Sequence, residues 1–217
     1  MQRKRVAILI SGRGSNMAAL ISAAADPDYP AEIALVVSNR PDAAGLARAR
    51  AARIATLVVD HKTFGKDRAA FEHALDAELS ARQIDLVCLA GFMRLFTPWF
   101  VSRWQGRLIN IHPALLPAFK GLDTHVRALA AGVKLHGASV HFVIPEMDSG
   151  PIIVQSALPV CDDDTPDTLA ARVLVAEHRI YPLALRWLAE GRLAVVDGRC
   201  KVAGASEHAE MLISPSA

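Results

Sequence analysis

Short apolar runs that alternate with helical patterns constrain the fold of this chain most. Four of them lie at residues 6–10, 33–37, 54–59 and 85–90. The segments between them predict helices at residues 17–25, 43–52 and 67–82. A continuous apolar run of this length is typical of a strand covered on both faces, as in a parallel sheet. The first half therefore predicts successive strand–helix units.

The second half follows another pattern. Residues 133–144 and 152–160 predict strands, and the turn composition of residues 145–151 joins them as an antiparallel pair. We also predict helices at residues 98–103, 124–131 (capped by Thr124) and 166–189, and a terminal hairpin of residues 193–196 and 200–202. The expected fold is a single α/β domain. Its mostly parallel, Rossmann-like twisted sheet has helices on both faces and is extended by antiparallel strands in the C-terminal half.

The composition excludes several classes of function. Of 217 residues 52% are apolar, enough for a buried core, and the formal charge of +2 argues against a nucleic-acid partner. No apolar stretch approaches the roughly 20 residues of a membrane helix, and residues 6–10 are too few for a secretory signal. The cysteines Cys88, Cys161 and Cys200 have neither CxxC nor zinc spacing. We expect a cytoplasmic, metal-free protein without a membrane partner.

Residues 11–16, Ser-Gly-Arg-Gly-Ser-Asn, lie between the first strand and the first helix. Glycines at such a junction let backbone amides and the helix dipole face an anion, and Ser15 and Asn16 add side-chain donors. A dinucleotide fingerprint is disfavoured, because Met17 replaces its third glycine and residues 37–40 lack the acid that would hold a ribose. The pattern favours a monophosphate group, with a plain capped turn as the alternative.

Two further features are weaker signals. Gly91 frees the backbone where the strand at 85–90 ends, and Met93, Leu95 and Phe96 follow it. These side chains are suited to the wall of a flat apolar guest, although core packing is their commoner use. Arg68 lies in the first turn of its helix, where a cation opposes the helix dipole, so it is either a ligand contact or a solvated residue.

Asn110 and His112 stand at the end of another strand. Strand alternation points both side chains to the same side, and Pro113 and Pro117 stiffen the chain that follows. Together with the acidic turn at residues 145–151, this pair favours a functional site over two incidental polar residues.

Five stretches carry a resemblance to a known family: ISGRGSN, LAGFMRL, INIHPALLPAFKG, HGASVHFV with its MDSGPII turn, and AEHRIYP. In this order, over about residues 6–190, they resemble the phosphoribosylglycinamide formyltransferase family. The NIHP…LLP part alone would indicate only the wider formyl-folate group, and the GSN turn and GLDTH at residues 121–125 narrow it. The departures, Ala118 and Lys120, lie at variable loop positions.

The resemblance implies formyl transfer from 10-formyltetrahydrofolate, a cosubstrate, to the amine of glycinamide ribonucleotide in purine biosynthesis, without a metal. It implies a catalytic trio of Asn110, His112 and Asp148. It implies substrate-binding residues that hold the phosphate or, at Glu177, the ribose: Gly14, Ser15, Asn16, Met17, Ala18 and Glu177. Folate-binding residues would be Arg68, Met93, Arg94, Leu95, Phe96 and Asn110.

On this basis we expect three parts within residues 1–217. They are a phosphate- and nucleotide-binding half at about residues 1–105, a catalytic and folate-binding half at about 106–190, and a terminal hairpin and tail at 191–217. The expected partners are small-molecule substrates. The oligomeric state stays open, with a homodimer as one option.

The chemistry makes these roles intelligible. When an amine attacks a formyl carbon, negative charge grows on the formyl oxygen, and preorganised donors aimed at that oxygen contribute most to catalysis. Asn110 can donate through its amide, and His112 donates best when protonated. Asp148, if adjacent, would favour the imidazolium form.

Four other functions are alternatives to this transfer. A 10-formyltetrahydrofolate hydrolase would be expected to have an N-terminal regulatory module before the first strand, and a methionyl-tRNA formyltransferase a C-terminal RNA-binding domain. A nucleotide-dependent oxidoreductase is opposed by the missing third glycine and ribose acid. A non-catalytic phosphate-binding module would leave Asn110, His112 and Asp148 unexplained.

Overall fold

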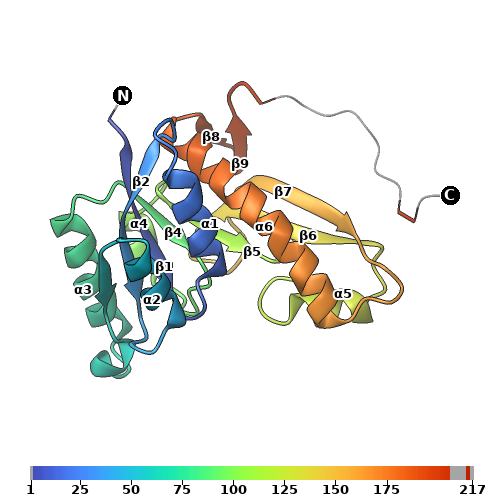
Figure 1. Ribbon diagram of the computed structural model, residues 1–217, viewed down its shortest axis with the longest axis horizontal. Coiled ribbons are helices and arrows are strands. Elements are labelled where there is room, and N and C mark those ends of the chain that lie inside the picture. Colours follow the sequence, from blue (N-terminus) through green and yellow to red (C-terminus); the bar gives the residue numbers. More distant parts are fainter. Residues whose placement is uncertain (1, 206–213, 216–217) are drawn as a thin grey trace.

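The computed structural model describes residues 2–205 and 214–215 (Figure 1). The strands are β1 (Lys4–Ile10), β2 (Ala31–Ser38), β3 (Thr56–Val58), β4 (Leu86–Leu89), β5 (Leu108–His112), β6 (Leu135–Phe142), β7 (Ile152–Pro159), β8 (Leu193–Val196) and β9 (Arg199–Val202). The helices are α1 (Ser15–Ala24), α2 (Ala44–Ala51), the 3₁₀ helix η1 (His61–Phe64), α3 (Arg68–Ala81), α4 (Pro98–Arg103), α5 (Thr124–Ala130) and α6 (Pro166–Ala189). Of the predicted tail, residues 206–213 and 216–217 lie outside the described residues.

The main sheet has seven strands in the order β3-β2-β1-β4-β5-β6-β7. The first five are parallel, and β6 and β7 add to them in antiparallel fashion, as predicted. The direction of winding reverses between β1 and β4. In open α/β sheets the crevice at such a switch point, beyond the carboxyl ends of the strands, is the usual ligand site. The loops after β1 and β4 therefore meet where a ligand is expected.

Helices cover both faces of the sheet, because apolar side chains of its strands point to both. Buried residues of α1, α2 and α6 form one core with the sheet, and those of α3 and α4 form a second core on the opposite face. On α3 the buried residues recur at helical spacing, at Phe71, Leu75 and Leu79. In Figure 1 the N-terminal units lie to the left, and β6, β7 and α5 extend to the right.

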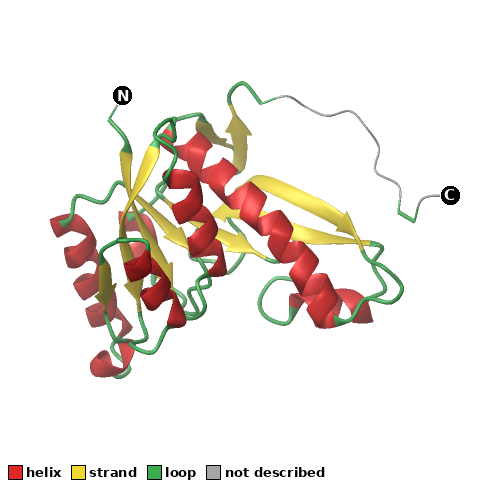
Figure 2. Cartoon of the chain, viewed as in Figure 1, coloured by secondary structure: helices red, strands yellow, loops and turns green. Residues whose placement is uncertain are grey.

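The long helix α6, which Figure 2 shows crossing the view in front of β6 and β7, ties the two halves together. It starts with a capping box in which Thr165 and Thr168 satisfy each other's backbone amides. Farther along, the buried Tyr181 hydroxyl donates to the carbonyls of Leu89 (2.9 Å) and Ile109 (3.3 Å). This contact fixes α6 against β4 and β5, and with it Glu177, one turn earlier.

Several element boundaries differ from expectation. The strand predicted at residues 54–59 covers only Thr56–Val58, and η1 follows it, because the Asp60 side chain accepts a hydrogen bond from the Lys62 amide (3.0 Å) and closes a turn. Thr124 does not cap α5 but is its first residue, after Asp123 in a left-handed conformation. The predicted terminal hairpin is confirmed as β8–β9. Among the described residues, no helix is both long and apolar enough to span a membrane.

Candidate active site

The loop after β1 forms a tight turn that leads directly into α1. We call it the phosphate turn (residues 12–16), after the role predicted for it. Gly14 is the N-cap of α1 and has a φ of 71°, which glycine adopts without strain. A Cβ atom on Gly14 would lie 2.9 Å from Met17 Cε and 3.1 Å from Gly45 Cα. The turn therefore favours glycine here. It leaves the first amides of α1 without intrahelical partners, as an anion site needs.

A pocket of about 560 Å³ adjoins the phosphate turn. Its other walls include residues that follow β2, β3 and β4, among them Asn39, Arg40, His61, Met93 and Arg94. Of the predicted substrate-binding residues, Ser15 and Asn16 line the pocket and Ala18 is exposed. The side chain of Met17 is fully buried beneath the turn, so only its backbone is available to a ligand.

Glu177 meets the phosphate turn from α6. Asn16 Nδ2 donates to Glu177 Oε2 at 2.7 Å, although the two residues are far apart in the sequence. Burial raises the pKa of the Glu177 carboxyl, and the hydrogen bond from Asn16 opposes that shift. Asn16 Oδ1 is buried without a partner. The half-buried Asn16 and the buried Glu177 thus form a polar pair beside the turn, suited to hydroxyl groups.

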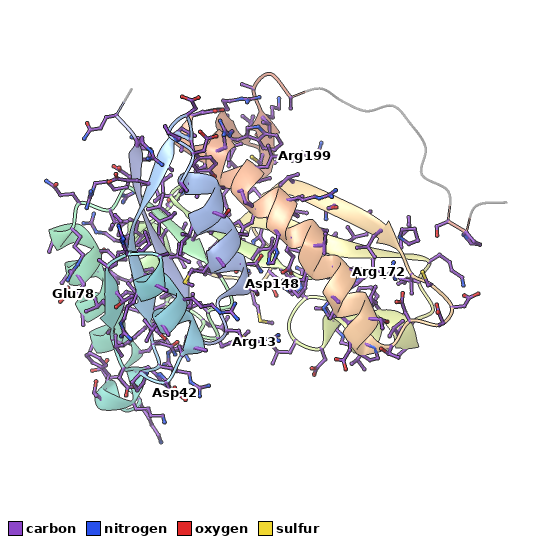
Figure 3. The ribbon with its side chains drawn as sticks, viewed as in Figure 1. Arg13, Asp42, Glu78, Asp148, Arg172 and Arg199 are labelled. Carbon is purple, nitrogen blue, oxygen red and sulfur yellow. The ribbon has the colours of Figure 1, made fainter. Side chains whose placement is uncertain are left out.

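Asn110, His112 and Asp148 come together at the end of β5. Oδ2 of Asp148 lies 3.4 Å from His112 Nδ1 and accepts a hydrogen bond from the Gly121 amide at 2.9 Å. Nε2 of His112 lies 3.0 Å from the Phe119 carbonyl oxygen. Because a carbonyl only accepts, this contact assigns a proton to Nε2 and leaves Nδ1 as the nitrogen that faces Asp148. Figure 3 labels Asp148 near the centre of the molecule in this view.

His141 is a fourth member of this group, which the sequence reading missed. The β5–β6 register sets it opposite Asn110, and its Nε2 lies 3.2 Å from Asn110 Nδ2 and 3.7 Å from Asp148 Oδ1. Its Nδ1 contacts the Phe142 carbonyl at 2.8 Å, which assigns the proton to Nδ1 and the lone pair to Nε2. Burial lowers the pKa of His141, so the neutral ring accepts from Asn110.

We call Asn110, His112, His141 and Asp148 the catalytic cluster, after the role predicted for three of them. The cluster depends on a close approach of the turn at residues 145–151 to β6. A Cβ atom on Gly150 would lie 1.8 Å from the Phe142 carbonyl oxygen, so only glycine fits. The Phe142 amide donates to the Pro151 carbonyl at 3.0 Å and fixes the turn. Within residues 2–205 and 214–215, no group of three or more histidine, cysteine or acidic side chains is arranged to hold a metal.

The loop after β4, here called the wall loop (residues 91–97), presents apolar side chains to solvent. Met93 is 70% and Leu95 56% exposed. Phe96 instead is buried and stacks on Phe100 at 4.2 Å between ring centroids, so it supports the loop from within the core. Arg94 lies over the Phe71 ring, and its Nε is buried without a partner. Arg68 is exposed in the first turn of α3.

Comparison with known proteins identifies the family of this chain. A family model described as formyl transferase matches residues 4–185, which is most of the chain. The chain belongs to the formyl transferase family. This confirms the resemblance that the five sequence stretches indicate.

Two relatives in this family cover the chain to different extents. The phosphoribosylglycinamide formyltransferase of Escherichia coli (strain K12) is 47% identical over 188 residues, 87% of this chain and 88% of that protein. The trifunctional purine biosynthetic protein adenosine-3 of Bos taurus is 49% identical over 190 residues, which make up 88% of this chain and 19% of that protein. The chain therefore spans about a fifth of the trifunctional relative's length.

Solved structures share the fold. Glycinamide ribonucleotide transformylase 1 from Symbiobacterium toebii has a TM-score of 0.89 and 45% identity, with 92% of this chain and 94% of that chain covered. A formyltetrahydrofolate deformylase from Pseudomonas syringae pv. tomato has a TM-score of 0.86 but 28% identity, with 93% and 66% covered. The parallel sheet with its antiparallel extension is therefore a formyl transferase fold.

Proposed function

We infer that this chain transfers the formyl group of 10-formyltetrahydrofolate to the amine of glycinamide ribonucleotide in purine biosynthesis. The observation that carries this proposal is the catalytic cluster, in which Asp148 faces His112 Nδ1 at 3.4 Å. A turn suited to a phosphate follows β1 of the same sheet. Membership of the formyl transferase family and the relatives' names support the same reaction.

In the proposed reaction, the substrate amine forms a bond to the formyl carbon and the bond from that carbon to the folate nitrogen breaks. The amine loses one proton and the folate nitrogen gains one, so the transfer balances without a further reactant. Asn110 is oriented by its contact with His141 Nε2, which engages one amide hydrogen and leaves the other for the formyl oxygen. His112 supplies the second donor when it also carries a proton at Nδ1: this N–H is shared between the formyl oxygen and Asp148 Oδ2, 3.4 Å away, and the carboxylate offsets the charge of the ring. Donors fixed before the reaction stabilise the negative charge that develops on oxygen.

The other contacts follow from the two loops. Amides of the phosphate turn would bind the substrate phosphate, and the Glu177 carboxylate would accept hydrogen bonds from the ribose hydroxyls. Met93 and Leu95 are exposed enough to contact the flat folate rings. Arg94, whose buried Nε has no partner, and Arg68 would contact the polar and anionic parts of the folate.

The alternative function is that of a deformylase, because the deformylase from Pseudomonas syringae shares the fold at lower sequence identity. A spectroscopic assay of formyl loss from 10-formyltetrahydrofolate, with and without glycinamide ribonucleotide, separates the two. We expect formyl loss to require the amine. Equal loss without it would identify a hydrolase and overturn the proposal. If the phosphate turn has the proposed role, a substrate that lacks the 5′-phosphate should have a higher KM than glycinamide ribonucleotide, with a smaller change in kcat.

A further inference from the structure

Two carboxylates on α3, one helical turn apart, hold the two ends of α4. Glu72 accepts hydrogen bonds from the Thr97 amide (2.7 Å) and from the Thr97 hydroxyl. Asp76 accepts one from Trp104 Nε1 at 2.9 Å. Thr97 and Trp104 are the N-cap and C-cap of α4. The short helix is therefore clamped at its start by Glu72 and at its end by Asp76.

The burial of Glu72 makes its contact with Thr97 unusual. Glu72 is 0% exposed. Burying a carboxylate costs free energy unless hydrogen bonds satisfy its oxygens. The Thr97 side chain does not cap α4, and its hydroxyl donates to Glu72. Glu72 therefore fixes the position of Thr97.

Thr97 is the last residue of the wall loop. Near the other end of that loop, the Met93 amide donates to the Ser11 hydroxyl at 2.8 Å. The exposed side chains of Met93 and Leu95 thus belong to a segment anchored at Ser11 and at Glu72. Arg68 lies four residues before Glu72 on α3, on the same face of the helix.

We propose that Glu72 is a positioning residue for the folate. Through Thr97 it sets where the exposed apolar side chains of the wall loop stand relative to Arg68. Glu72 is too buried to touch the ligand itself. This inference rests on the proposed function, because it takes the wall loop as part of the folate site. Asp76 anchors the far end of α4, so it should matter for stability but not for folate binding.

The matched variants Glu72→Met and Asp76→Leu test this difference. Each replaces a carboxylate by an apolar side chain of similar size. Glu72→Met leaves the Thr97 amide and hydroxyl without their acceptor, and Asp76→Leu does the same to Trp104 Nε1 and Arg103 Nε. We expect Glu72→Met to raise KM for the formyl-folate about tenfold, with kcat and KM for the ribonucleotide changed less than about twofold. In Asp76→Leu, kcat and the KM values for both substrates should stay within about twofold of those of the parent. Glu72→Gln, whose amide oxygen can still accept from the Thr97 amide, should restore most of the folate affinity.

Hydrogen exchange at residues 92–97 gives a readout that does not depend on activity. Exchange there should rise in Glu72→Met and stay near the parent in Asp76→Leu. If Glu72→Met fails to fold, Thr97→Val, which removes only the hydroxyl donor, should still raise the folate KM about threefold. Equal folate KM changes in the Glu72 and Asp76 variants, or a folded Glu72→Met with parental KM, would overturn the inference. An inactive parent protein would instead count against the proposed function.

Discussion

The phosphate turn is built from one run of five residues, whereas the catalytic cluster draws its side chains from β5, β6 and the turn after β6. The turn presents backbone amides, and its shape depends on the left-handed conformation of Gly14. The cluster presents side chains, and it depends on the antiparallel register that sets His141 opposite Asn110. Both lie near the carboxyl ends of parallel strands in the same sheet.

This difference teaches which kind of change each region tolerates. An anion site made of backbone amides should tolerate new side chains wherever the backbone conformation allows them. A site made of buried, coupled side chains should be sensitive to the loss of a single charge, even when the shape is kept. The predictions below test these two sensitivities against each other.

The largest effect is expected for Asp148→Asn in the catalytic cluster. The amide keeps the shape of Asp148 but removes the negative charge that faces His112 Nδ1 at 3.4 Å. We expect kcat to fall at least about 100-fold near neutral pH, the scale of a lost oxyanion or acid–base contribution. Asp26→Asn is a control, because Asp26 accepts a single backbone hydrogen bond, from the Asp28 amide, in an exposed turn. Near-normal turnover of Asp148→Asn would show that Asp148 stabilises the turn but does not take part in catalysis.

A smaller effect is expected for Gly14→Ala in the phosphate turn. The new Cβ atom would lie 3.1 Å from Gly45 Cα, and φ at this position is 71°. A shifted turn should raise KM for the ribonucleotide about tenfold, as one weakened anion contact would, with the folate KM changed less than about twofold. Gly106→Ala is the matched control, since Gly106 has a similar φ of 70° but no atom lies within 4 Å of an added Cβ, and it lies outside the phosphate turn. Equal damage to both KM values would argue against a phosphate role.

The smallest effect concerns stability in acid and comes from a buried histidine on β6, the strand that also carries His141. His136, on β6, is 0% exposed, and its ring packs edge-on against His125 and Phe119. Burial, reinforced by the charges of His125 and His112, lowers its pKa to about 4. An unfolded histidine titrates near 6.5, so the unfolded state binds more protons between these values and stability falls as the pH drops from about 6.5 towards 4.

His136→Phe keeps an aromatic ring at this position but removes the titration. The loss of Tm between pH 7 and pH 4.5, followed by calorimetry, should be smaller than in the parent by roughly 2–4 °C, the scale of about 1 kcal/mol for a chain of this size. His73→Phe, at an exposed position on α3, should leave the acid slope unchanged. An unchanged slope in His136→Phe would assign the acid sensitivity to other groups.

Local features could be predicted from the sequence. The two-residue period of a strand suffices to put Asn110 and His112 on one side of β5, and the glycines suffice to indicate the turn before α1. The strand–helix units predict the parallel sheet, because each unit is encoded by neighbouring residues. The ends of helices and strands were predicted less well: η1 was not predicted, and Thr124 is the first residue of α5 and not its cap.

The sequence by itself determined the order of strands and helices, the phosphate turn and the paired polar residues of β5, since each depends on local conformation. Only the tertiary structure decided that His141 accepts from Asn110, that Glu177 reaches Asn16, and that Phe96 faces the core. These contacts join segments whose register and packing depend on the whole sheet. A strand's alternation tells which residues share a face, but only its pairing partner decides what they meet.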